Sequence, residues 1–116
     1  MLGIVTATLL ALTSQNITTN GRPLVQPRML TPPAPAFPRA AERAGIMSGF
    51  VRVECGVDKT EGRFVDCQIL EETPQGAGFG EAVLTAMRRA RLDPPSLVDA
   101  APNARIRLSF PFELRN

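Results

Sequence analysis

Cys55 and Cys67 have the clearest capacity for covalent chemistry in this sequence, since two thiols can form a disulfide, bind a metal or act as nucleophiles. They are the only cysteines among 116 residues, and the chain has no histidine. Two cysteines are too few for a zinc tetrad, and their spacing is not that of a CxxC redox motif. His-activated Ser or Cys nucleophiles are also excluded. We therefore predict no catalytic residue, no metal site and no cofactor, and we expect that the protein is not an enzyme.

The two cysteines lie in a pair of segments whose alternation predicts a β-hairpin. The apolar positions of these segments are Val51, Val53, Cys55 and Val57, followed by Val65, Cys67 and Ile69. A three-residue loop, Thr60–Gly62, with Gly62 in the left-handed conformation, would pair Cys55 with Cys67. The same register pairs Val57 with Val65 and Val53 with Ile69, so that one face carries all the apolar side chains.

Two helices and a third strand complete the predicted fold. Residues 39–44 are good helix formers between Pro38 and Gly45, which mark a start and a stop. A longer helix is indicated by apolar residues at helical spacing, namely Phe79, Val83, Ala86, Met87 and Ala90. Residues 105–115 alternate like a strand that is apolar on one face. We predict an α+β fold in which two helices pack on one face of a three-stranded antiparallel sheet, in the order α-β-β-α-β.

The N-terminal third differs in composition from the rest. Residues 2–13 form an apolar run with the length of a signal-peptide core, shorter than the ~20 residues of a transmembrane helix. We expect residues 1–15 to be a signal peptide or a weak N-terminal anchor, with a buried strand as the alternative. Residues 16–36 are rich in proline and predict a linker near polyproline II, which leaves residues 37–116 as one folded domain.

The charge pattern argues against nucleic acid as a partner. The formal net charge is +2, from 13 basic and 11 acidic residues spread along the chain. Neither Trp nor Tyr is present as a stacking platform for bases. The sequence therefore predicts no nucleic-acid partner.

Short motifs follow one another in a characteristic order between Phe37 and Leu114. They include an aromatic–proline pair at Phe37-Pro38, a glycine turn at Gly45-Ile46 and Gly49, and a helix end at residues 86–91 before Pro94. Further matching positions are Val51, Val53, Val57, Gly62, Val65, Ile69, Leu70, Ala82 and Ala86. Taken in order, this set resembles the C-terminal domain of TonB-type energy transducers.

The resemblance implies a periplasmic module that binds extended segments (TonB boxes) of outer-membrane TonB-dependent transporters and contributes to energised transport. Binding would occur by β-strand addition to the last strand. The implied site residues are Arg105, Ile106, Arg107, Leu108, Ser109 and Phe110. Pro111 opposes this interpretation, because proline protects the edge of a sheet. Arg105 and Arg107 would either flank an acidic peptide or keep the exposed face soluble.

Other features of the resemblance bear on the partners. Full-length transducers carry a transmembrane helix with a functional histidine, and this sequence has neither. Coupling to motor proteins of the ExbB/ExbD type is therefore not expected of this polypeptide alone. The alternative function is a stand-alone structural or assembly adaptor of the cell envelope without a transport role, and a homodimer formed by strand exchange belongs to that alternative. An exported, periplasmic address and the opposed positions of Cys55 and Cys67 favour a disulfide over two free thiols.

Overall fold

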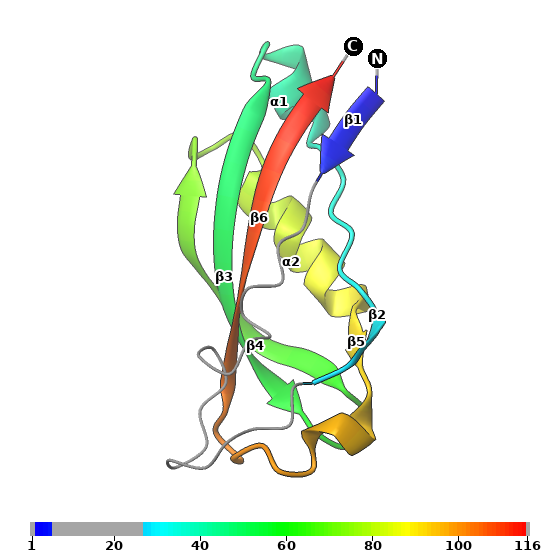
Figure 1. Ribbon diagram of the computed structural model, residues 1–116. Coiled ribbons are helices and arrows are strands. Elements are labelled where there is room, and N and C mark those ends of the chain that lie inside the picture. Colours follow the sequence, from blue (N-terminus) through cyan, green and yellow to red (C-terminus); the bar gives the residue numbers. More distant parts are fainter. Residues whose placement is uncertain (1, 6–26, 116) are drawn as a thin grey trace.

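Three long antiparallel strands form the centre of the fold (Figure 1). The computed structural model describes residues 2–5 and 27–115. The long strands are β3 (Ser48–Asp58), β4 (Arg63–Thr73) and β6 (Arg105–Arg115). Three short strands extend the sheet: β1 (Leu2–Val5), β2 (Met29–Thr31) and β5 (Arg91–Leu92). The helices are α1 (Arg39–Arg43) and α2 (Phe79–Arg89), with a 3₁₀ helix at Pro94–Leu97.

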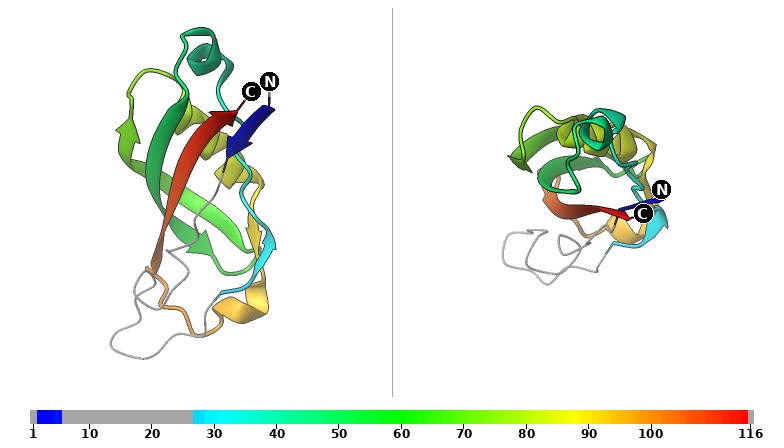
Figure 2. Two further views of the ribbon diagram at one scale, coloured as in Figure 1. Left: turned by 45° about the horizontal axis from the view of Figure 1, so that its top comes forward. Right: turned by 90° about the horizontal axis from the view of Figure 1, so that it is seen from above.

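The predicted α+β class and the order of the main elements are confirmed, whereas the three-stranded sheet is a correction. The sheet has the order β1-β6-β3-β4-β5-β2, with β3 between β6 and β4. The strands that the prediction missed have two to four residues, which is too short for an alternating pattern to be recognised. The sheet curls, and both helices lie on the same side of it (Figure 2).

The apolar stripes predicted for α2 and for the last strand form the core. The stripe of α2 is buried, with relative exposures of 0–6% for Phe79, Val83, Ala86, Met87 and Ala90. The alternate residues of β6 are also buried: Ile106, Leu108, Phe110, Phe112 and Leu114. Val51, Val53 and Cys55 complete the core from β3. Both periodicities therefore report the buried faces correctly.

An aromatic cluster explains two of the short motifs. The rings of Phe37 and Phe79 meet edge to face with centroids 5.4 Å apart, and the centroids of Phe79 and Phe112 are 4.9 Å apart. Gly49 lies directly against this cluster, since a Cβ atom there would be 2.6 Å from the ring of Phe79. The segment before α1, the start of β3, the start of α2 and the end of β6 are thus fixed to one another by packing.

The hairpin register is right at its centre and wrong at its ends. Val53 pairs with Ile69 as predicted, but Val57 pairs with Phe64 instead of Val65. The loop has four residues, 59–62, because Asp58 pairs with Arg63 and the Gly62 amide donates to the Asp58 carbonyl. An extra residue of β4 near Asp66 then restores the predicted register. As a consequence Phe64 is buried and Val65 is 41% exposed.

Gly62 should not tolerate a side chain. Its φ is +73°, and a Cβ atom there would collide with the carbonyl oxygen of Leu92, whose amide donates to the Gly62 carbonyl. We expect Gly62→Ala to lower the free energy of unfolding by at least about 3 kcal/mol, as the sum of left-handed strain and a backbone clash. Urea denaturation measures this change.

Gly76 provides the matched control, because its φ is +80° and no atom lies within 4 Å of its Cβ position. Gly76→Ala should cost only the left-handed penalty of about 1–2 kcal/mol. Equal losses for the two variants would show that the approach of β5 to Gly62 is not tight.

Part of the predicted linker lies against the domain. Residues 27–31 run beside the segment that follows α2: Met29 of β2 pairs with Leu92 of β5. The Arg28 guanidinium contacts the Asp93 carboxylate at 2.6 Å, and the Asp93 amide donates to the Arg28 carbonyl. Pro33 and Pro35 are buried.

Among the described residues, no helix is long and apolar enough to cross a membrane.

Candidate peptide-binding edge

The last strand, β6, has one side on β3 and one side toward the outer edge of the sheet. Toward β3 it pairs without interruption from Gly56↔Arg105 to Ser48↔Glu113. On the other side, β1 pairs with residues 112–115. None of the strands that the structure describes pairs with residues 105–111 on that side. This stretch is the edge strand in which the sequence placed the binding residues.

The register shows which main-chain groups this edge presents. The Leu114 amide donates to the Met47 carbonyl, on the β3 side. Since both main-chain groups of a strand residue point to one side and successive residues alternate, the even-numbered residues of β6 face β3 and the odd-numbered ones face the edge. Arg105, Arg107 and Ser109 therefore direct N–H and C=O groups outward. Pro111 directs a carbonyl outward. Because its main chain faces the edge, the absence of an N–H group at this residue removes no hydrogen bond between β6 and β3.

The six predicted binding residues thus divide into two groups. Arg105, Arg107 and Ser109 have the main-chain orientation that strand addition requires. Ile106, Leu108 and Phe110 face β3 with their main chain and are buried in the core. The sequence predicted that residues 105–115 form a strand, and this is confirmed, but alternation alone does not say which set of residues faces the neighbouring strand.

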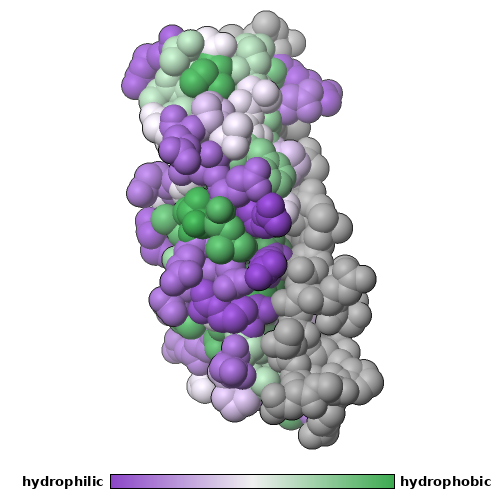
Figure 3. Space-filling model, turned by 90° about the vertical axis from the view of Figure 1, so that its left-hand side faces the viewer, coloured by the Kyte–Doolittle hydropathy of each residue, from purple (hydrophilic) through white to green (hydrophobic). Residues whose placement is uncertain are grey.

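The opposite margin of the sheet, formed by β4, has a different construction. Beyond Arg63↔Arg91, no described strand pairs with β4 on the side away from β3. The pairing of β4 shifts twice, near Asp66 and at Leu70, and Asp66 has a φ of +53°. Polar surface separates the apolar patches on the side of the molecule where β4 lies (Figure 3). Bulges and charged residues hinder the pairing of a further strand, so β6 is the edge better suited to an added strand.

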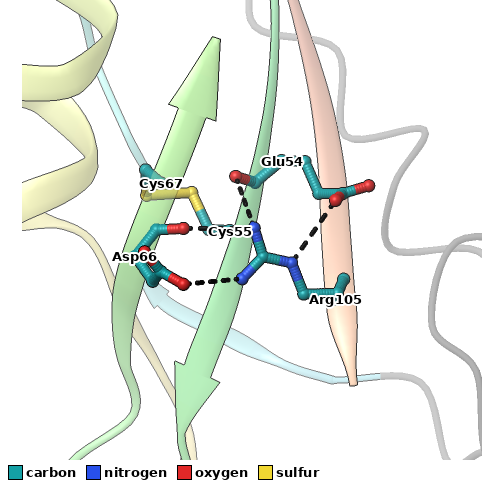
Figure 4. Close-up of a disulfide and its surroundings, with 5 residues drawn as sticks. All are labelled: Glu54, Cys55, Asp66, Cys67 and Arg105. Carbon is teal, nitrogen blue, oxygen red and sulfur yellow. Dashed lines mark hydrogen bonds and ion pairs between the residues drawn. A yellow bond between two sulfur atoms is a disulfide. The ribbon is translucent and has the colours of Figure 1, made fainter. Parts of the chain in front are cut away.

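A disulfide and an arginine network support the start of β6 (Figure 4). Cys55 and Cys67 are joined in a disulfide, as the sequence predicted, and Cys55 pairs with Ile106 across the sheet. The Arg105 guanidinium donates to the Asp66 carbonyl at 3.1 Å and lies 3.4 Å from the Glu54 carboxylate. The disulfide and Arg105 therefore tie β4, β3 and the first outward-facing residue of β6 to one another.

Arg107 contacts the same carboxylate, with its Nε 2.8 Å from Glu54 Oε1. Its side chain is 56% exposed, whereas that of Arg105 is 31% exposed. An acidic ligand would compete with Glu54 for Arg107 and with both Glu54 and Asp66 for Arg105. Arg107 is consequently the more accessible of the two predicted flanking cations.

Glu54 should make stability depend on pH. The hydrogen bond from Arg107, followed by that from Arg105, holds the pKa of Glu54 below its ordinary value of 4.5, although partial burial opposes the shift. The stabilisation is therefore fully present above about pH 4.5 and is lost as the pH falls through the lower pKa of the folded state. We expect a loss of about 1 kcal/mol or less between pH 7 and pH 3. Urea denaturation at these two pH values measures it.

Glu54→Gln should remove this part of the pH dependence, whereas Glu113→Gln, at a carboxylate that is 62% exposed, should leave it. The same pH dependence in wild type and Glu54→Gln would contradict the assignment.

A groove lies beside α2, away from the residues predicted for peptide binding. This groove of about 620 Å³ runs between residues 31–39 and α2, and it is lined mainly by proline and alanine, with Arg39, Glu81 and Arg89 among the lining residues. The structure brings no group of three or more potential metal ligands together within the described residues.

The chain matches a family of known proteins. A family described as Gram-negative bacterial TonB protein C-terminal matches residues 33–114, which is most of the chain. The chain belongs to this family. No curated protein matches it significantly. The TonB C-terminal family comprises TonB-like energy transducers, its domains are periplasmic, and its members interact in general with outer-membrane transporters. The resemblance seen in the sequence is thereby confirmed.

Proposed function

We propose that this TonB-like domain is a periplasmic binding module, not an enzyme, which takes up TonB boxes of outer-membrane TonB-dependent transporters by β-strand addition and contributes to energised transport. The ligand strand pairs with residues 105–111 of β6. The observation that carries the proposal is a difference between the two long margins of the sheet. The pairing of β6 with β3 has a continuous register, whereas the pairing of β4 with β3 shifts register twice.

Three outward main-chain donors give the proposed site its chemistry. The N–H groups of Arg105, Arg107 and Ser109 lie two residues apart along one strand without a bulge, which is the spacing of a β ladder. Their side chains lie on the solvent face, and Arg107 is more exposed than Arg105. A bound strand would therefore gain its affinity from main-chain hydrogen bonds, and acidic residues beside Arg107 would add to it.

An NMR titration of the full chain with synthetic TonB-box peptides from transporter plug domains tests the proposal. We expect saturable shifts of the Arg105, Arg107 and Ser109 amides that exceed those of the β4 amides. Slower hydrogen exchange of these three amides in the complex would identify main-chain pairing. Shifts confined to β4, or to the groove beside α2, would overturn the proposed site, and the absence of binding by any peptide would overturn the proposed function.

A further inference from the structure

The edge of β6 has two parts: residues 112–115, the covered part, pair with β1, and residues 105–111, the open part, pair on that side with none of the strands that the structure describes. Strand β1 pairs antiparallel with the end of β6, from Leu2↔Arg115 to Val5↔Phe112. Figure 1 shows the N and C ends side by side at this place. The four residues of β1 cover about a third of the eleven residues of β6. The covered part continues the open part directly, on the same side of the same strand.

The register of β1 defines the contacts that it makes. Glu113 and Arg115 are odd-numbered residues of β6, so their main-chain groups face β1 and form its hydrogen-bonded pairs with Ile4 and Leu2. Gly3 and Val5 face away from β6 with their main chain. Pro111, which offers the edge no N–H, lies between Ser109 and Glu113 and separates the open part from the covered part.

We propose that the N-terminal strand β1 occupies part of the docking edge in cis and competes there with a long ligand strand. This inference rests on the proposed function. With β1 in place, the edge offers the donors of Arg105, Arg107 and Ser109; with β1 displaced or removed, it also offers those of Glu113 and Arg115. A ligand that pairs only with residues 105–111 is unaffected by β1, whereas a ligand that spans all of β6 must first displace it.

Hydrogen exchange in the full chain tests the occupation without any ligand. Ile4→Pro removes the N–H that faces β6, and Gly3→Pro is the matched control because its N–H faces away. We expect the Glu113 amide to exchange at least about tenfold faster in Ile4→Pro than in wild type or Gly3→Pro. The Leu114 amide, which is bonded to Met47, should be unchanged in all three. Equal exchange of Glu113 in wild type and Ile4→Pro would overturn the proposal.

Binding of two TonB-box peptides then tests the competition. A peptide long enough for all of β6 should bind Ile4→Pro at least about tenfold more tightly than wild type, which corresponds to about 1.4 kcal/mol. A peptide that spans only residues 105–111 should bind both with equal affinity. Equal affinities of the long peptide for both proteins would overturn the competition while leaving the proposed function intact. If neither peptide binds any variant, the proposed function fails, and the exchange of Glu113 still reports on β1.

Discussion

Ser109→Pro should strongly weaken the binding of TonB-box peptides while leaving the domain folded. The Ser109 main chain faces the outer edge of β6, so the substitution removes a donor from the edge but no hydrogen bond from the β3 ladder. The proline ring also occupies space that the added strand needs. We expect affinity to fall at least about tenfold, measured by NMR titration or calorimetry of the full chain.

Two further variants make this test selective. Ser109→Ala keeps the main-chain donor and should bind as wild type does. Leu108→Pro removes an N–H that faces β3 and a buried side chain, so it should reduce stability by about 3 kcal/mol or more. Unchanged affinity of Ser109→Pro would contradict strand addition at this position, whichever way the other two variants behave.

Reduction of the disulfide should lower the free energy of unfolding by about 3 kcal/mol. The bridge closes a short loop, with a sequence separation of 12 residues, and thereby restricts the unfolded chain. A loss of this size is a large fraction of the stability of a small domain. Urea denaturation of the oxidised protein and of the same protein in excess reductant measures the difference.

The double variant Cys55→Ala, Cys67→Ala is the control for this comparison, because its stability should not respond to the reductant. It also reports the packing of the fully buried Cys55 side chain separately from the bridge. If oxidised and reduced wild type unfold at the same urea concentration, the disulfide does not stabilise the fold.

The buried faces could be predicted from the sequence because the apolar residues of a buried face recur with the period of the helix or strand. The stripe of α2 and the alternate residues of β6 follow the helical and strand periods, and all of them are in the core. The disulfide followed from the register at the centre of the hairpin. The ends of that register were wrong because the bulge near Asp66 has no distinctive residue type: a non-glycine residue there adopts a positive φ, held between the disulfide and the Arg105 contact.

The finer form of the candidate site could not be read from the sequence. Whether Arg107 or Leu108 faces the edge depends on the side of β6 that β3 occupies, and this is a property of strand order. The pairing of β1 with β6 joins residues more than a hundred positions apart. The sequence offered a buried strand only as an alternative to a signal peptide or anchor at that place, and Met1 and residues 6–15 of that segment lie outside the described residues.

The unequal margins of the sheet also limit how copies of the chain can assemble. Two copies could pair their β6 strands around a two-fold axis, and this would use the margin of each that has no bulge. The bulged β4 margins left outside would then accept no further copy. A protein with two receptive margins can polymerise without end, whereas one with a single receptive margin forms a closed pair. Pairing through the margins of the sheet would thus produce dimers of this domain and not filaments.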